Sequence, residues 1–197
     1  SQSQALLPVM QVLEDDTVLL HILDDAAAAG DGPSVRIGRE NEAEELAGVS
    51  VVANRYGRGG KTIAVYRDFG LERGALASTV SHDSHNFTVS YHDPKDAFRA
   101  AEILRACGGG VCVIDGAEET HIALPAAGLM SQKPCAEVAD EIAAVQAALD
   151  AISSGRLTLL ATAVMALPVL PSVVITDMGL VNGTNQTFVP VFADTEA

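Results

Sequence analysis

Short apolar runs separated by polar links dominate the first half of the chain. The runs Gly48–Asn54 and Thr62–Phe69 enclose a glycine-rich link, and this arrangement predicts a β-hairpin. Further strands are predicted at Ala75–Val80, Phe87–Tyr91 and Val111–Ile114. The first 47 residues predict two more strands, at 9–13 and 18–23, and a solvated face or short helix at the acidic run 40–45.

Two later segments have the spacing of amphipathic helices. The first is predicted to begin at Asp93-Pro94, because aspartate caps a helix and proline suits its first turn, and to end at glycines 108–110. The second runs from about Pro134 to Ile152. Its apolar residues fall at offsets 0, 4, 7, 11 and 14 and form one continuous stripe: Val138, Ile142, Val145, Leu149 and Ile152.

These elements predict an α+β fold, in which a mixed β-sheet is covered by two main helices. We expect one domain over residues 1–197. The segment 157–170 is apolar and interrupted by proline, so its pattern does not distinguish a helix from a strand.

Composition and charge reduce the number of function classes that fit this chain. Twelve basic against 26 acidic residues give a net charge of −14, which disfavours binding to nucleic acid or to an anionic membrane surface. No apolar run is long enough to span a membrane, and the start lacks the basic and apolar regions of a secretion signal. The three cysteines form no CxxC spacing. We therefore expect a cytoplasmic protein.

Familiar catalytic motifs are incomplete. Gly60-Lys61-Thr62 resembles the end of a phosphate-binding loop, but Arg55 occupies the position where that loop needs glycine. The sequence has no His-x-Glu with Pro-Cys-x-x-Cys, no His-x-His and no Gly-x-Ser-x-Gly. These absences exclude the zinc nucleobase deaminases and the nucleophile elbow of α/β-hydrolases.

One stretch concentrates polar chemistry between two predicted strands: Ser81, His82, Asp83, Ser84, His85 and Asn86. The histidines could ligate a metal, transfer protons or contact a heteroaromatic ligand, and the aspartate could fix a histidine tautomer. Two histidines alone do not complete a zinc site. Such side chains also build ordinary turns, so a turn and a functional site both stay open. We expect a loop whose side chains are not buried without partners.

This polar stretch lies in a longer segment that resembles a known family. Residues 70–86 (GLERGALASTVSHDSHN) closely resemble the hallmark sequence of bacterial and archaeal adenine deaminases. Three further motifs follow in the family's order, LPAAGLMS at 124–131, ALPVLP at 166–171 and TDMGL at 176–180. The resemblance covers a family-like core at residues 48–181, whereas residues 1–47 and 182–197 match weakly. Gln132 stands where an acidic residue is common in the family.

The resemblance implies a reaction and a missing partner. The family belongs to the amidohydrolases and converts adenine and water to hypoxanthine and ammonia at a metal centre, whose ligands lie in a preceding (β/α)₈ barrel. The matching stretch is the C-terminal domain. We therefore expect this chain to bind no metal itself, to be inactive alone, and to pack on a barrel that holds Mn, Fe or Zn.

In that interpretation the polar loop helps to close a purine pocket and exclude water. We expect His82, Asp83 and His85 to be catalytic and Ser84 and Asn86 to bind the substrate, with the separate roles of the histidines open. Two alternatives remain: a non-catalytic module that packs on the barrel and supports a homo-oligomer, and a free-standing purine-binding domain.

Overall fold

A computed structural model describes residues 48–56, 60–66, 70–82, 84–171 and 173–189. The strands and the acidic element predicted before residue 48 lie outside the described residues, and so does Asp83. Within the described part of the chain, no helix has the length and apolar character needed to cross a membrane.

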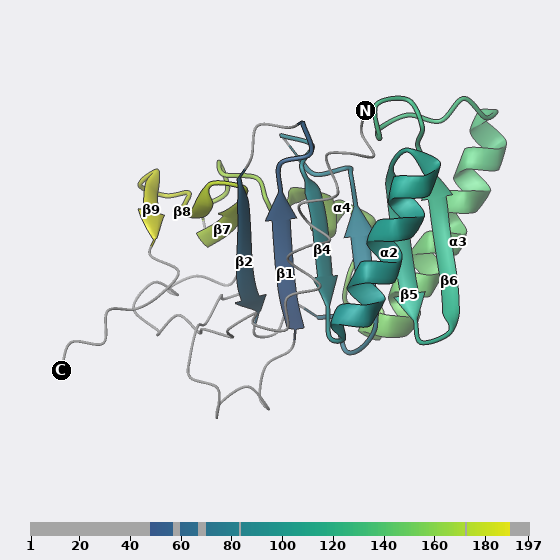
Figure 1. Cartoon of the computed structure of the whole chain (residues 1–197), viewed down its shortest axis with the longest axis horizontal. Coiled ribbons are helices and arrows are strands. Elements are labelled where there is room, and N and C mark those ends of the chain that lie inside the picture. The colour runs from purple at the N-terminus through teal and green to yellow at the C-terminus, as the bar shows by residue number, and fades with distance from the viewer. Residues whose placement is uncertain (1–47, 57–59, 67–69, 83, 172, 190–197) are drawn as a thin grey trace.

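A six-stranded β-sheet is the centre of the fold (Figure 1). Its order is β2-β1-β4-β3-β5-β6, and every neighbouring pair is antiparallel. The strands are β1 (Gly48–Ala53), β2 (Lys61–Tyr66), β3 (Ala75–Ser78), β4 (Phe87–Tyr91), β5 (Gly110–Asp115) and β6 (Glu118–Ala123). The predicted hairpin is confirmed by β1 and β2, which pair over their full length.

Two helices connect and cover these strands, which confirms the α+β class with two main helices. Helix α2 (Pro94–Cys107) joins β4 to β5, which run in the same direction with β3 between them. The predicted strand–helix–strand unit is therefore present, but an antiparallel strand separates its two strands. The N-cap is as predicted, because the Asp93 carboxylate accepts from Lys95 N at 2.8 Å.

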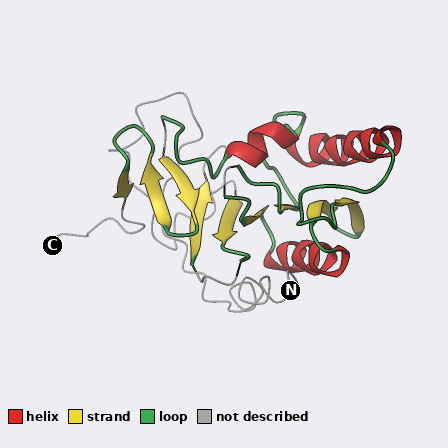
Figure 2. Ribbon diagram, turned by 90° about the horizontal axis from the view of Figure 1, so that it is seen from above, coloured by secondary structure: helices red, strands yellow, loops and turns green. Residues whose placement is uncertain are grey.

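The helices lie on opposite faces of the sheet, as Figure 2 shows from above. The alternation of side chains along β5 explains this: Cys112 and Ile114 pack in one cluster with α2, and Val111 and Val113 pack in another with α3 (Cys135–Ser153). Burial raises the pKa of the Cys112 thiol to about 12.

The stripe predicted along α3 is only partly buried. Val145, Leu149 and Ile152 are fully buried, whereas Ile142 is 45% exposed. The reason is that α3 packs across β5 and β6, and β6 is the outermost strand described on that side. The first half of the helix therefore has less of the sheet to cover.

Two parts of the fold differ from the sequence expectation. Strand β6 was not predicted, because as an edge strand it carries exposed polar residues such as Glu119 and His121 and lacks an apolar alternation. The ambiguous segment 157–170 contains a short helix, α4 (Leu159–Val164). A separate antiparallel sheet follows it, made of β7 (Val173–Thr176), β8 (Gly179–Asn182) and β9 (Thr187–Val189).

Candidate functional site

The candidate site lies at one end of the six-stranded sheet, where the connections after β1, β3 and β6 meet the segment that precedes β5 (Figure 1). We call this the Arg55 end. It comprises the described residues of 54–60, 79–86, 108–110 and 124–131. Antiparallel pairing places these segments together, because β1, β3 and β6 all end on this side and β5 begins there.

Backbone hydrogen bonds hold the polar loop in place. His85 N donates to the Ser81 carbonyl at 2.6 Å, and His82 N donates to the Ala163 carbonyl at 2.7 Å. Ala163 lies in the last turn of α4, whose carbonyls have no partner within the helix. The polar loop and the apolar segment 157–170, which contains α4, therefore stabilise each other. His85 has a φ of 51°, in the left-handed region that side chains other than glycine rarely adopt.

The predicted site residues have different exposures. His82 and Ser84 are exposed, His85 is half-buried and Asn86 is buried. The rings of His82 and His85 lie close together, with their centroids 5.8 Å apart and their planes tilted by 48°. The structure thus brings the two histidines together and confirms that the stretch is a loop.

Three polar atoms of the loop are buried without a hydrogen-bond partner among the described residues: Ser81 Oγ, His85 Nδ1 and Asn86 Oδ1. This contradicts the expectation that such side chains are not buried unpaired. Each buried, unsatisfied polar group destabilises a fold by about 1–3 kcal/mol. A loop that holds three of them is not optimised for stability.

Arg55 ties the loop to its neighbours. Its Nε donates to the His85 carbonyl at 2.5 Å and its Nη2 donates to the Ala127 carbonyl at 2.7 Å. The hydroxyl of Tyr56 also donates to the His85 carbonyl, at 3.3 Å, and the guanidinium lies 4.7 Å from the centre of the Tyr56 ring. Arg55 therefore links three of the connections that meet at this end.

The environment of Arg55 is unusual for a charged group. The side chain is 3% exposed, and none of the described carboxylates forms an ion pair with it. Loss of hydrating water on burial lowers the pKa of the guanidinium, with the Tyr56 side chain acting in the opposite direction. In the sequence, Arg55 stands out only as a residue that breaks a phosphate-loop pattern, because its burial depends on segments distant in the chain.

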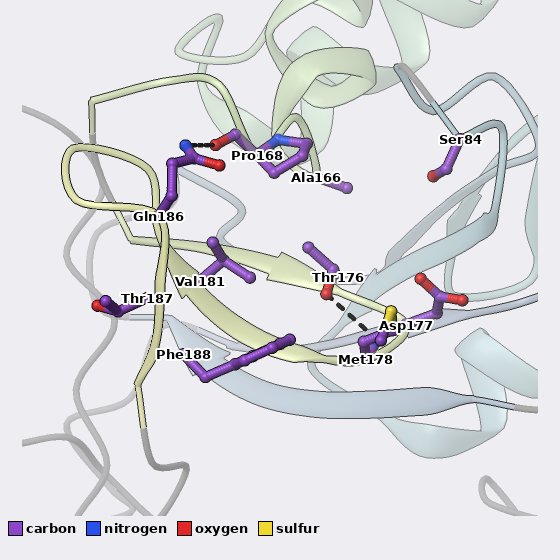
Figure 3. A pocket seen from close by; sticks show the side chains of 10 residues that line it. All are labelled: Ser84, Ala166, Pro168, Thr176, Asp177, Met178, Val181, Gln186, Thr187 and Phe188. Carbon is purple, nitrogen blue, oxygen red and sulfur yellow. Dashed lines mark hydrogen bonds between the residues drawn. The ribbon is translucent and has the colours of Figure 1, made fainter.

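A pocket of about 560 Å³ lies between the polar loop and the three-stranded sheet (Figure 3). Its described lining residues are Ser84, Ala166, Pro168, Thr176, Asp177, Met178, Val181, Gln186, Thr187 and Phe188. Figure 3 shows Ser84 and Asp177 on the side opposite Gln186. Asp177, at the turn between β7 and β8, accepts from Asn54 Nδ2 at 3.1 Å. Asp177 belongs to the TDMGL motif, but the motif alone does not place its carboxylate at a site.

Metal-ligating side chains are sparse in the described part of the chain. Nowhere among these residues do three or more His, Cys, Asp or Glu side chains gather in a way that could hold a metal ion. His82 and His85 are two nitrogen donors, fewer than the three protein ligands of a catalytic zinc.

The fold and site define a class: an α+β domain that gathers a polar loop, a buried guanidinium and unpaired polar atoms at one end of its sheet. A sequence model described as the adenine deaminase C-terminal domain matches residues 34–187. This chain therefore belongs to the adenine deaminase C-terminal domain family. A second model, of the HrcA protein C terminal domain, matches only residues 1–66, most of which lie outside the described residues.

Curated relatives agree with this assignment. The chain is 36% identical to an adenine deaminase of Methanothrix thermoacetophila over 176 residues, which are 88% of this chain and 31% of the relative. It is 38% identical to one of Cereibacter sphaeroides over 183 residues, 91% and 31% of the two chains. It is 35% identical to one of Moorella thermoacetica over 189 residues, 92% and 30%. The chain thus spans just under a third of the length of these relatives.

Proposed function

We propose that this chain is the C-terminal part of an adenine deaminase and that its polar loop completes a purine site formed mainly by another domain. The observation that carries the proposal is the set of buried, unpaired atoms of Ser81, His85 and Asn86. Buried polar atoms without a partner are uncommon in folds, and a ligand or partner that completes their hydrogen bonds is one explanation for a group of them in a single loop. Membership of the family supplies the reaction, the hydrolysis of adenine to hypoxanthine and ammonia.

The length of the relatives supports a second domain. Because the chain matches about 31% of each relative, most of such an enzyme lies elsewhere. We propose that the remainder is an amidohydrolase barrel that holds a divalent metal, Mn, Fe or Zn. The metal, when bound, lowers the pKa of the attacking water. We further propose a cytoplasmic, homo-oligomeric enzyme of purine metabolism.

Within this chain, His82 and His85 are the proposed proton-transfer groups. Imidazole changes charge near neutral pH, so it can hold a proton that hydrolysis must deliver to the leaving ammonia. The 5.8 Å between the two rings lets both face one small ligand. Asp83 is proposed to orient one of the rings.

Ser84 and Asn86 are the proposed substrate-binding groups. The exposed Ser84 lines the pocket and can hydrogen-bond to a purine directly. Asn86 Oδ1 is buried, so we propose that it acts through a bridging water.

The test uses the complete enzyme with His82→Ala and His85→Ala. We expect kcat/KM for adenine to fall by about 10²–10⁴-fold in at least one variant, the range typical of a lost general acid or base. His121→Ala is the matched control, because His121 is an exposed histidine on the edge strand β6. Unchanged turnover in both loop variants would overturn the catalytic role of the loop.

A second candidate function, a non-catalytic module for assembly, is favoured by exposed apolar side chains. Val169, Met178 and Phe188 are 70%, 75% and 62% exposed, and the last two line the pocket. Clustered exposed apolar groups are typical of protein interfaces. Met178→Asp with Phe188→Asp should weaken assembly of the complete enzyme in sedimentation experiments if this function holds. Unchanged assembly would exclude it.

A further inference from the structure

We propose that Arg55 is a positioning residue, which fixes the backbone of His85 and thereby aims the polar loop at the substrate. The inference rests on the proposed function, and it adds Arg55 and Gly128 to the residues that the function requires. It is carried by the contacts of the buried guanidinium, which joins the loop to the connection after β6.

The His85 carbonyl accepts hydrogen bonds from both Arg55 Nε and the Tyr56 hydroxyl. His85 has a left-handed φ of 51°, a conformation that needs support from its surroundings in any residue other than glycine. Two donors on this carbonyl fix the orientation of the peptide that follows His85. The direction of the imidazole therefore depends on Arg55.

The contacts at this position need an arginine. Its planar guanidinium presents several N–H groups in a fixed fork, so one side chain can bind the carbonyls of His85 and Ala127 together. A lysine ammonium keeps the charge but lacks the fork. Because the group is buried and no described carboxylate pairs with it, it is a poor means of stabilising the fold. Its geometry is the property that the site uses.

Gly128, in the LPAAGLMS motif, lies against the Arg55 guanidinium. A Cβ at this position would lie 2.9 Å from Arg55 Nη1 and 3.0 Å from Thr79 Oγ1. The hydroxyl of Thr79 also donates to the Gly128 carbonyl at 2.6 Å. Gly128 therefore leaves the space that the guanidinium occupies, and Gly128→Ala is an independent way to displace Arg55.

The chain offers matched controls for both changes. Arg99 also donates to two turn carbonyls, of Gly116 at 2.8 Å and Ala117 at 2.9 Å, but its side chain is 36% exposed and lies at the opposite end of the sheet. Gly155 has a φ of 70°, close to the 73° of Gly128, and a Cβ there would meet nothing within 4 Å. Arg99→Ala and Gly155→Ala thus repeat the chemical change without disturbing the loop.

The experiment measures adenine turnover by the complete enzyme. We expect Arg55→Ala, Arg55→Lys and Gly128→Ala each to lower kcat by about 100-fold, the effect of misplacing a catalytic group by roughly 1 Å, with a smaller change in KM. Millimolar guanidinium should restore at least about tenfold of the activity of Arg55→Ala, because it refills the vacated site. The Arg99→Ala and Gly155→Ala enzymes should keep their activity and show no rescue.

The inference is overturned if Arg55→Lys and Gly128→Ala fold and keep wild-type kcat, or if guanidinium fails to rescue a folded Arg55→Ala enzyme. If Arg55→Ala does not fold, Arg55→Lys and Gly128→Ala decide alone. The proposed function fails separately, through unchanged turnover in His82→Ala and His85→Ala. If those two variants lose activity while the Arg55 and Gly128 variants do not, only the positioning role is wrong.

Discussion

Arginine side chains at the two ends of the six-stranded sheet have opposite environments. At the Arg55 end the guanidinium is buried and contacts carbonyl oxygens. At the opposite end, Arg73 pairs with Asp115 at 2.8 Å and Arg99 pairs with Glu119 at 2.9 Å, and all four side chains are at least a third exposed. The hydrogen bond from Arg73 lowers the pKa of the Asp115 carboxyl.

This difference contrasts an end built from exposed ion pairs with the end to which we assign the function. Exposed ion pairs are solvated and contribute little to stability, so the opposite end could be built in many ways. The Arg55 end holds a buried charge and three unpaired polar atoms, each of which destabilises the fold. Groups that lower stability and still occur together in one loop are expected where activity requires them.

The largest expected effect is on the free energy of unfolding, and it is found by comparing one glycine from each end of the sheet. At Gly110 a Cβ would lie 1.9 Å from the Ile122 carbonyl on the paired strand, and φ is 143°. Gly110→Ala should therefore lower the free energy of unfolding by at least about 3 kcal/mol. Gly116, in the turn at the opposite end, has a φ of 58° and open space around it, so Gly116→Ala should lose only about 1 kcal/mol.

Urea denaturation of the chain measures both glycine variants. Similar losses at the two positions would contradict the claim that the close approach of the Ile122 carbonyl makes Gly110 the more constrained of these two glycines. The comparison is clean because both residues have positive φ and only Gly110 approaches another backbone.

A smaller effect, of opposite sign at two positions, is expected from two fully buried serines. Ser81 Oγ has no partner among the described atoms, whereas Ser153 Oγ donates to the Leu149 carbonyl at 2.7 Å. Ser81→Ala should stabilise the chain by about 1 kcal/mol, because it removes an unsatisfied group. Ser153→Ala should destabilise it by about 1 kcal/mol, because it removes a hydrogen bond.

Thermal or urea unfolding of the two serine variants gives the sign directly. A destabilised Ser81→Ala chain would show that the Ser81 hydroxyl has a hydrogen-bond partner in solution. The unpaired atom of Ser81 would then no longer support a functional role for the loop. A stabilised one would agree with a loop kept polar for activity.

Elements governed by local rules could be predicted from the sequence. Helix α2 was found because Asp93, Pro94 and Gly108 are cap signals that act within a few residues. The strands around the polar loop were found because its polar run interrupts apolar ones. Strand β6 was missed since an exposed edge lacks the apolar alternation. The second sheet was missed because its strands are three or four residues long.

The site could be predicted only in part, for a related reason. Six polar side chains between two strands reveal a loop, and the motifs reveal a family. Burial of Arg55 depends on carbonyls 30 and 72 residues further along the chain, at His85 and Ala127. No local pattern encodes such contacts. The same holds for the unpaired atoms of Ser81 and Asn86, which polarity alone predicted would not be buried.

The smallest expected effect is a difference between the two ends in how stability depends on pH. Asp115 has a lowered pKa in the folded chain because Arg73 donates to it, so the pair stabilises the fold above the carboxyl's unfolded pKa of about 3.9. That stability is lost as the pH falls through the lowered, folded-state value. Asp115→Asn should therefore weaken the chain slightly at pH 7, and less in high salt, and make no difference once the carboxyl is protonated.

Contacts of Arg55 should not respond in this way. Carbonyl oxygens do not titrate, so the loss of stability in Arg55→Ala, which introduces no titratable side chain, should stay the same as the pH falls from about 5 into the range where Asp115 is protonated. Denaturation of the Asp115→Asn and Arg55→Ala chains across this pH range and across salt concentrations compares the two ends directly. An acid- or salt-dependent Arg55→Ala effect in that range would mean that a carboxylate faces Arg55 in solution, and the contrast between the ends would no longer hold.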